Sequence, residues 1–287
     1  MSKIKIIECP RDAMQGIKTF IPTELKAKYI NKLLKVGFDT LDFGSFVSPK
    51  ATPQMRDTAE LLGMLDLETS KSDLLSVVAS KGGAKRAVVF EQIKYLGFPL
   101  SISETFQFRN TRKTISESFE AIKAIQNLCL AHNKELIVYL SMAFGNPYGD
   151  FYNEEILYNF TEKLDKIGIR TVLLSDTIGV SDSENIKSSF ETLIPAFPHI
   201  EIGSHFHSNP NTATAKISAA YAAGCKRFDG ALKGYGGCPM AKDELTGNLA
   251  TEKMIDYFVN QNLDLGLDLD VFGESMLLSD EVFGVYH

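Results

Sequence analysis

Four side chains of this 287-residue sequence carry the nitrogen and oxygen atoms that bind divalent cations: Asp12, His205, His207 and Asn248. One residue separates His205 from His207, so on an extended strand both imidazoles leave the same face. With a carboxylate and an amide oxygen they form a mixed ligand set that suits Mg²⁺ or Mn²⁺ and keeps positions open for substrate and water. A His-x-His pair alone more often ends a strand in surface hydrogen bonds, but its combination with Asp12 favours a metal site.

Three more residues could take part in chemistry beside such a site. Arg11 could hold a developing enolate oxygen through its fixed charge, or simply tie loops together. Cys238 lies in a Gly-Gly-Cys-Pro segment, so we expect a loop thiol that can donate or accept a proton; a small buried side chain is the alternative. Asp176 could cap a helix or orient a metal ligand, and both interpretations stay open.

The elements that would position these residues follow from apolar periodicity, which predicts eight strand-then-helix units. The segment 83–95 is ambiguous, since 87–90 could be a strand, but its spacing favours a helix. The expected strands are 3–8, 38–43, 74–79, 98–103, 136–142, 171–175, 200–205 and 227–230. The other expected helices are 22–36, 53–65, 114–133, 153–167, 183–196, 211–223 and 251–262.

Eight such units without an intervening linker favour a closed (β/α)₈ TIM barrel over an open sheet. We therefore expect one domain over residues 1–287, with 263–287 as a C-terminal cap or packing segment. Active sites of these barrels lie where strands end and the following loops begin. Arg11 and Asp12 follow the first strand, Asp42 closes the second, Asp176 follows the sixth, and the histidines and Asn248 follow the last two. All candidates are thus predicted on one rim.

Composition limits the partners. The formal net charge of −6 argues against sequence-independent nucleic-acid binding, which needs a basic surface. No apolar run is long enough for a signal peptide or a membrane span, so we expect no membrane partner. The four cysteines have no CxxC spacing, which favours free thiols in the cytoplasm. Dinucleotide-binding and P-loop glycine motifs are not found in the sequence.

Several segments together resemble the hydroxymethylglutaryl-CoA lyase family, one of the metal-dependent barrel lyases that also include isopropylmalate and homocitrate synthases. They occur in the family's order over nearly the whole chain. The combination of SFVSPK, GGCP and GNLATE is specific to the lyase branch. The similar segments are PRD at 10–12, SFVSPK at 45–50, PQM at 53–55, DTIGV at 176–180, HFH at 205–207, GGCP at 236–239 and GNLATE at 247–252.

The resemblance implies a barrel, usually a homodimer, that cleaves 3-hydroxy-3-methylglutaryl-CoA to acetyl-CoA and acetoacetate. By that analogy Asp12, His205, His207 and Asn248 bind the metal, which chelates the substrate's C3 oxygen and carboxylate. Arg11 would stabilise the thioester enolate, Cys238 would lie on a mobile loop used in proton transfer, and His205 could transfer a proton as well. We also expect a catalytic role for Asp42, and substrate contact or ligand support from Ser45 and Asp176.

Four positions depart from the family's pattern. Ala13 follows Arg-Asp in place of glycine, Asp42 replaces a glutamate, and Ser208 replaces the aspartate after His-x-His. Ile7 replaces another glutamate, and the neighbouring Glu8 is predicted to point to the opposite face of the strand. We expect these positions to surround the acyl group and to influence which acyl-CoA is cleaved.

Two other functions compete with the lyase hypothesis. An aldolase or Claisen-type synthase that uses a 2-oxo acid would share the metal site, but the lyase-type segment around Cys238 and the lack of a long C-terminal domain disfavour it. A non-catalytic barrel that binds acyl-CoA or a metal would need neither Arg11 nor Cys238, so the presence of both disfavours it.

Overall fold

Eight parallel strands close into a barrel in the computed structural model, which describes residues 3–237 and 246–286. Each strand pairs with the next along the chain, and the last pairs with the first to complete the ring. A short ninth strand runs antiparallel to the seventh. The strands are β1 (Lys5–Glu8), β2 (Thr40–Ser45), β3 (Asp73–Val77), β4 (Ile93–Ser101), β5 (Glu135–Ser141), β6 (Thr171–Asp176), β7 (Glu201–Ser208), β8 (Arg227–Gly230) and β9 (Gly247–Asn248).

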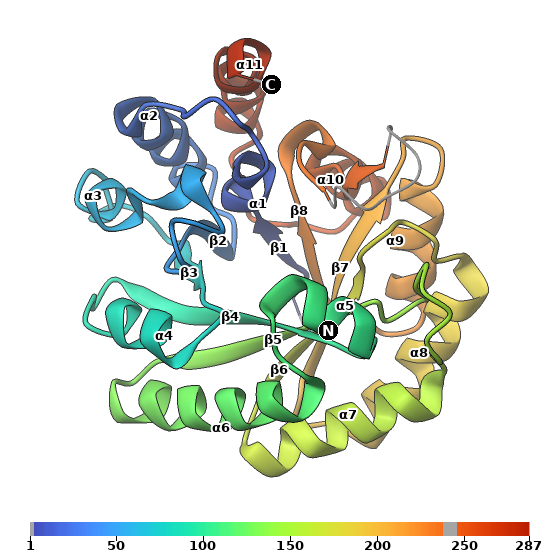
Figure 1. Ribbon diagram of the computed structural model, residues 1–287. Coiled ribbons are helices and arrows are strands. Elements are labelled where there is room, and N and C mark those ends of the chain that lie inside the picture. Colours follow the sequence, from blue (N-terminus) through green and yellow to red (C-terminus); the bar gives the residue numbers. More distant parts are fainter. Residues whose placement is uncertain (1–2, 238–245, 287) are drawn as a thin grey trace.

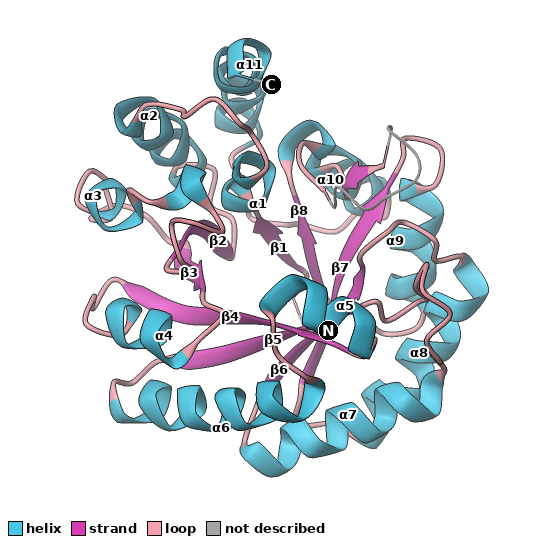
Figure 2. Ribbon diagram, in the orientation of Figure 1, coloured by secondary structure: helices cyan, strands magenta, loops and turns pink. Residues whose placement is uncertain are grey.

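Helices surround this barrel on its outside (Figure 1), and Figure 2 shows the strands gathered within the ring that they form. The predicted (β/α)₈ TIM barrel is therefore confirmed. The helices are α1 (Pro10–Gln15), α2 (Thr23–Leu34), α3 (Thr58–Leu62), α4 (Lys81–Ala87), α5 (Glu104–Thr111), α6 (Ile115–Ala131), α7 (Glu154–Ile167), α8 (Ser183–Ala196), α9 (Ala213–Ala222), α10 (Thr251–Asn260) and α11 (Leu269–Tyr286), with 3₁₀ turns η1 (Pro53–Met55) and η2 (Leu232–Gly234).

The two faces of the barrel strands belong to two separate cores. Because the strands are covered on both faces, most of their residues are buried, and in β2, β6 and β8 every residue is buried. The outward face packs against the helices in one large core. The inward face fills the barrel with a small cluster of Leu75, Tyr95, Ile137, Tyr139 and Leu173.

Local signals fix the ends of several helices. Thr114 begins α6 with a capping box, in which its hydroxyl accepts from the Glu117 N–H while the Glu117 carboxylate accepts from the Thr114 N–H. Gly168 ends α7 in the left-handed conformation, at a φ of +93°. These two helices match the sequence-based prediction closely.

The prediction for 83–103 was partly wrong. Helix α4 ends at Ala87, and β4 begins at Ile93, five residues before the expected start of the strand. Lys94 and Gly97 have low strand propensity, but tertiary contacts accommodate them. Lys94 pairs with Asp73 at 2.7 Å, and Gly97 leaves room for the ring of Tyr139, which a Cβ there would approach within 2.9 Å.

Three further local corrections concern the rim of the barrel. The Pro-Arg-Asp segment is the first turn of α1 rather than an open turn, because Pro10 occupies a first-turn position whose missing N–H costs nothing. The expected helix 53–65 is divided into η1 and α3. Asp42 does not close β2: it lies in the middle of the strand, just before a register shift, and is completely buried.

The C-terminal segment forms α11, which lies beside α2 at the edge of the barrel (Figure 1). Ion pairs join Lys28 to Glu281 at 2.7 Å and Lys32 to Glu274 at 2.6 Å. The ring of Phe283 also stacks on Tyr235, in the loop after β8, with centroids 4.2 Å apart. The segment thus packs against α2 and the loop after β8. No helix among the described residues is long and apolar enough to cross a membrane.

Candidate metal centre

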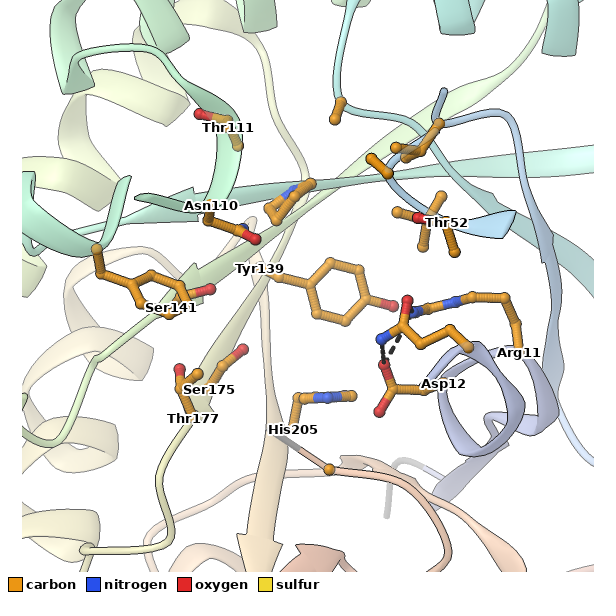
Figure 3. Close-up of a pocket in the computed structure, with 18 of the residues that line it drawn as sticks. Arg11, Asp12, Thr52, Asn110, Thr111, Tyr139, Ser141, Ser175, Thr177 and His205 are labelled. Atoms are coloured by element: carbon orange, nitrogen blue, oxygen red, sulfur yellow. Dashed lines mark hydrogen bonds and ion pairs between the residues drawn. The ribbon is translucent and has the colours of Figure 1, made fainter. Parts of the chain in front are cut away.

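Three of the four proposed metal ligands converge at the carboxyl end of the barrel strands. Asp12 comes from α1, directly after β1, while His205 and His207 come from β7. One carboxylate oxygen and one nitrogen from each imidazole lie within 4.8 Å of one another. The two imidazole rings are on the same face, with centroids 5.7 Å apart, and Figure 3 shows Asp12 facing His205. This geometry could hold one cation between the three side chains.

Each histidine already uses its Nδ1 atom. His205 Nδ1 lies 3.3 Å from Oδ2 of Asp229, and His207 Nδ1 lies 2.8 Å from the backbone oxygen of Thr177. Metal-bound histidines commonly donate their other ring N–H to a carboxylate or carbonyl in this way. The Nε2 atom of each ring is therefore the one available to a cation, so the residues present fit a metal site.

Asn248 joins the same cluster through a pairing that the sequence did not reveal. It lies in β9, where it is the register partner of His207. Its Nδ2 donates to Oδ2 of Asp12 and to the backbone oxygen of Tyr235, both at 2.8 Å. Because both hydrogen bonds use Nδ2, the amide oxygen is the atom of Asn248 that could bind a cation.

Arg11 is fixed beside Asp12 by three side chains. Its Nε donates to Asp42 at 2.9 Å, and its Nη2 also pairs with that carboxylate. Its Nη1 donates to Asp12 at 2.8 Å and to Oε1 of Gln15 at 2.9 Å. Gln15 in turn donates from Nε2 to Asp12 at 2.7 Å. These contacts hold the guanidinium group of Arg11 in one orientation beside Asp12.

Gln15 was missed at the sequence level. Its spacing of three and four residues from Asp12 and Arg11 on a helix was the signal that could have revealed it.

Burial and neighbouring charges have opposing effects on the pKa values of Asp12 and Asp42. Burial would raise the pKa of Asp12, but the charges of Arg11, His205 and His207 lower it below its ordinary value. Burial raises the pKa of Asp42 to about 6, against the opposing effect of Arg11. Burial also lowers the pKa of His207, and His205 lowers it further, which favours the neutral imidazole that metals bind.

A cavity of about 320 Å³ opens beside this cluster, within the size range of small-molecule sites. One wall comes from α5, an unpredicted helix that contributes Phe106, Asn110 and Thr111. Deeper in the cavity, the hydroxyls of Tyr139 and Ser175 are buried and make no hydrogen bond within the described residues. The Tyr139 ring lies edge-on to His205 at 5.3 Å (Figure 3), so a ligand of the cavity would reach the metal cluster directly.

Two residues expected to support the site, Ser45 and Asp176, do not line the cavity. Ser45 Oγ donates to the Val77 carbonyl and accepts from the Val47 N–H, both at 3.2 Å, and it does not line the cavity. Asp176 accepts from the Val180 N–H at 2.9 Å and pairs with Lys216 at 2.5 Å. It does not cap α8, whose N-cap is Asp182. Cys238 lies outside the described residues.

The four departures from the family pattern are buried positions outside the lining of this cavity. Ile7, Ala13, Asp42 and Ser208 are all buried, and none is among the described residues that line the cavity. This corrects the expectation that they surround the acyl group. Asp42 faces Arg11, and Ala13 lies against Gly236, where a Cβ would approach the Ala13 Cα within 2.7 Å.

Comparison with known proteins identifies the family of this chain. Residues 3–275 match the HMGL-like family. The chain belongs to the HMGL-like family. It is 34% identical over 259 residues to hydroxymethylglutaryl-CoA lyase YngG of Bacillus subtilis strain 168, covering 88% of this chain and 83% of that protein. It is thus an HMG-CoA lyase-like enzyme.

Solved structures of HMG-CoA lyases have the same fold as this HMGL-like chain. The crystal structure of the Bacillus subtilis HMG-CoA lyase superposes with a TM-score of 0.92 at 30% identity, covering 99% of this chain and 95% of that chain. The HMG-CoA lyase of Acinetobacter baumannii, in complex with coenzyme A and 3-methylmalate, gives a TM-score of 0.89 at 29% identity. That match covers 98% of this chain and 92% of the other.

Proposed function

We propose that this protein is a divalent-metal-dependent lyase that cleaves 3-hydroxy-3-methylglutaryl-CoA, or a close 3-hydroxyacyl-CoA, to acetyl-CoA and acetoacetate. The observation that carries the proposal is the convergence of Asp12, His205 and His207 beside a fixed Arg11 at one end of a cavity. The coenzyme A in the related Acinetobacter baumannii lyase supports an acyl-CoA as the substrate class.

The cation would be held by Asp12, His205, His207 and Asn248. When bound, Mg²⁺ or Mn²⁺ would supply Lewis-acid polarisation of the substrate's oxygen atoms. Asp12, His207 and Asn248 are buried, which favours this assignment, because charged and hydrogen-bonded groups act more strongly where water is excluded. Family membership points to a divalent metal in the same way.

In the proposed retro-Claisen reaction the bond between C2 and C3 breaks, and its electron pair passes to the thioester as an enolate. The C3 hydroxyl loses its proton and becomes the ketone of acetoacetate. The enolate takes up a proton at C2 and becomes acetyl-CoA. We assign the proton delivered to C2 to Cys238. The proton of the C3 hydroxyl would pass to water in the cavity, because both ring nitrogens of His205 are engaged, Nδ1 by Asp229 and Nε2 by the cation.

Arg11 would stabilise the enolate, because Asp42 and Gln15 hold its guanidinium in place before charge develops. In this role Asp42 acts through Arg11 and not by touching substrate. Tyr139 and Ser175 line the cavity, so their side chains would lie against the acyl group.

The decisive assay is acetoacetate release from 3-hydroxy-3-methylglutaryl-CoA with Mg²⁺ or Mn²⁺, repeated with EDTA. His207→Ala should abolish turnover and weaken Mn²⁺ binding. The matched control is His132→Ala, which removes an exposed imidazole just after α6 and should change neither property. Absence of turnover by folded, Mn²⁺-loaded protein would refute this substrate, and acetyl-CoA with a 2-oxo acid would then test the synthase alternative.

A second variant separates the enolate role of Arg11 from its structural role. Arg11→Ala would leave Asp42 as a buried carboxylate without its cation, so loss of folding would obscure the result. Arg11→Lys keeps the charge but loses the forked contacts. We expect Mn²⁺ affinity to persist while kcat falls by about 10²–10³-fold, the usual cost of a missing oxyanion donor. Unchanged kcat would remove Arg11 from the mechanism.

Two further expectations accompany the proposal. We propose a homodimer, which light scattering would test. We also propose a cytoplasmic location, supported by the described cysteines Cys9, Cys129 and Cys225, which are all free thiols.

A further inference from the structure

Two residues of β8, Arg227 and Asp229, lie inside the barrel behind the metal centre. One residue separates them, so their side chains leave the same face of the strand. Asp229 is the register partner of His205 on the neighbouring strand β7. Both β8 side chains are 1% exposed, and neither lines the cavity. They are therefore placed to act on His205 from the side away from substrate.

A chain of charges connects these residues to His205. Oδ2 of Asp229 lies 3.3 Å from Nδ1 of His205, and Oδ1 of Asp229 lies 3.8 Å from Nε of Arg227. The other end of Arg227 donates from Nη1 to Glu201 at 3.3 Å, at the start of β7. Glu201 pairs with Lys5 at 2.7 Å. Arg227 is thus held between two carboxylates, one of which contacts His205.

The backbone makes room for this arrangement at Gly203. A Cβ at Gly203 would lie 3.1 Å from both Cβ and Cδ of Arg227, and 2.4 Å from Cδ2 of Leu173. A side chain there would force Leu173 to move and would crowd Arg227. On β7, Gly203 therefore leaves space for Arg227, and His205, two residues along, contacts Asp229.

Stability alone does not account for these buried charges. Nε and Nη2 of Arg227 and Oδ1 of Asp229 are buried and make no hydrogen bond within the described residues. Buried ion pairs with unsatisfied atoms are often less stable than apolar side chains of the same volume. A carboxylate on the Nδ1 atom of a histidine has a known use instead: it fixes the ring's tautomer and orientation and raises its basicity as a ligand.

We propose that Asp229 is a positioning residue of the metal centre and that Arg227 holds it in place. Asp229 accepts the Nδ1–H of His205, so the lone pair of Nε2 points to the cation site. The Nδ1 atom of His207 contacts only the neutral carbonyl of Thr177, so His205 should be the stronger of the two ligands to the cation. This inference rests on the proposed function, because it takes His205 as a metal ligand.

The test measures Mn²⁺ affinity and the tautomer of His205. Asp229→Asn keeps the shape of the side chain but removes its charge. The double variant Arg227→Met/Asp229→Asn removes both buried charges, and it serves if the single variant fails to fold. The matched control is Asp57→Asn, which breaks a buried ion pair with Lys26 remote from the histidines. The ¹⁵N-histidine NMR spectrum of the metal-free protein contains only five histidines, and His205→Gln identifies the signal of His205.

We expect wild type to carry the proton of His205 on Nδ1. Asp229→Asn and the double variant should bind Mn²⁺ about 10–100-fold more weakly, the usual effect of losing such a partner, and should shift the His205 nitrogen signals. Asp57→Asn should bind Mn²⁺ as wild type does. Unchanged affinity in both Asp229 variants, or weaker binding without a change in the His205 signals, would overturn the role of Asp229. Failure of wild type itself to bind Mn²⁺ would instead overturn the proposed metal centre.

Discussion

Glu8 should make the stability of this protein depend on pH in the opposite sense to most carboxylates. It shares the outward face of β1 with Ile6 and is completely buried. Its carboxyl group accepts from the Leu232 N–H at 2.9 Å and from the Thr251 hydroxyl at 2.5 Å. Burial raises the pKa of Glu8 to about 8, although both hydrogen bonds lower it. The folded protein therefore retains a proton at neutral pH that the unfolded chain releases.

The size of the effect follows from linkage. The pKa of Glu8 rises from 4.5 to about 8 on folding. Between these pH values the folded state binds one more proton than the unfolded state, so the free energy of unfolding falls by about 1.4 kcal/mol per pH unit. The loss begins near pH 4.5, reaches on the order of 5 kcal/mol at pH 8 and is constant above it. Below pH 4.5 both states are protonated, and Glu8 contributes no pH dependence.

Glu8→Gln tests this because an amide has no proton to lose in this range, while its oxygen can still accept from the Leu232 N–H. In urea unfolding between pH 5 and pH 8, we expect the free energy of unfolding of the variant to rise relative to that of wild type by about 1.4 kcal/mol per pH unit. The matched control is Glu120→Gln, at an exposed position of α6, which should show no such trend. A constant difference between Glu8→Gln and wild type across this range would refute the argument from burial.

Three other perturbations have expected outcomes. Gly230→Ala should destabilise by about 1–3 kcal/mol, because its Cβ would lie 2.4 Å from Cε of Met254 and 2.5 Å from a backbone oxygen; an unchanged urea midpoint would contradict this. Lys216→Met should cost about 3–5 kcal/mol by leaving the buried Asp176 without its cation, and adding Asp176→Asn should recover part of the loss in the same measurement. Mn²⁺ at 100 times the wild-type Kd should raise the free energy of unfolding of wild type by about 2.7 kcal/mol in thermal unfolding, and EDTA should reverse this. At the same Mn²⁺ concentration Asn248→Ala should gain less, and equal gains would exclude Asn248 as a ligand.

The barrel could be predicted from sequence because its signals are local. Buried parallel strands have continuous apolar runs, and helices such as α6 combine a capping box with a helical period. The errors fell where tertiary contacts override propensity. Helix α5 has little amphipathic character, with only Phe106 and Gln107 buried, so no periodic signal indicated it. Strand β4 contains Lys94 and Gly97, which the barrel accommodates through partners distant in sequence.

The same distinction applies to the candidate site. Asp12, His205 and His207 could be brought together from sequence, since the rim of a barrel collects the residues that follow its strands. Asn248 reaches them through the antiparallel pairing of β9 with β7, which no local pattern indicates. Asp229 was also missed, because a charged residue inside a predicted strand has no signal for its partner until the register of β7 and β8 is known.

The structure also moves the question of substrate choice to different residues. The positions at which this chain departs from the family pattern are buried and do not line this cavity, so we expect them to act on substrate through the residues that they support. Asp42 is one methylene shorter than the family's glutamate, yet it still pairs with Arg11, so the shorter side chain keeps the positive charge in place. Side chains that do face the cavity include Phe106 on α5, Tyr139 and Ser175. We therefore expect a substitution at Phe106, which faces the cavity, to change acyl preference more than one at Asp42, which does not.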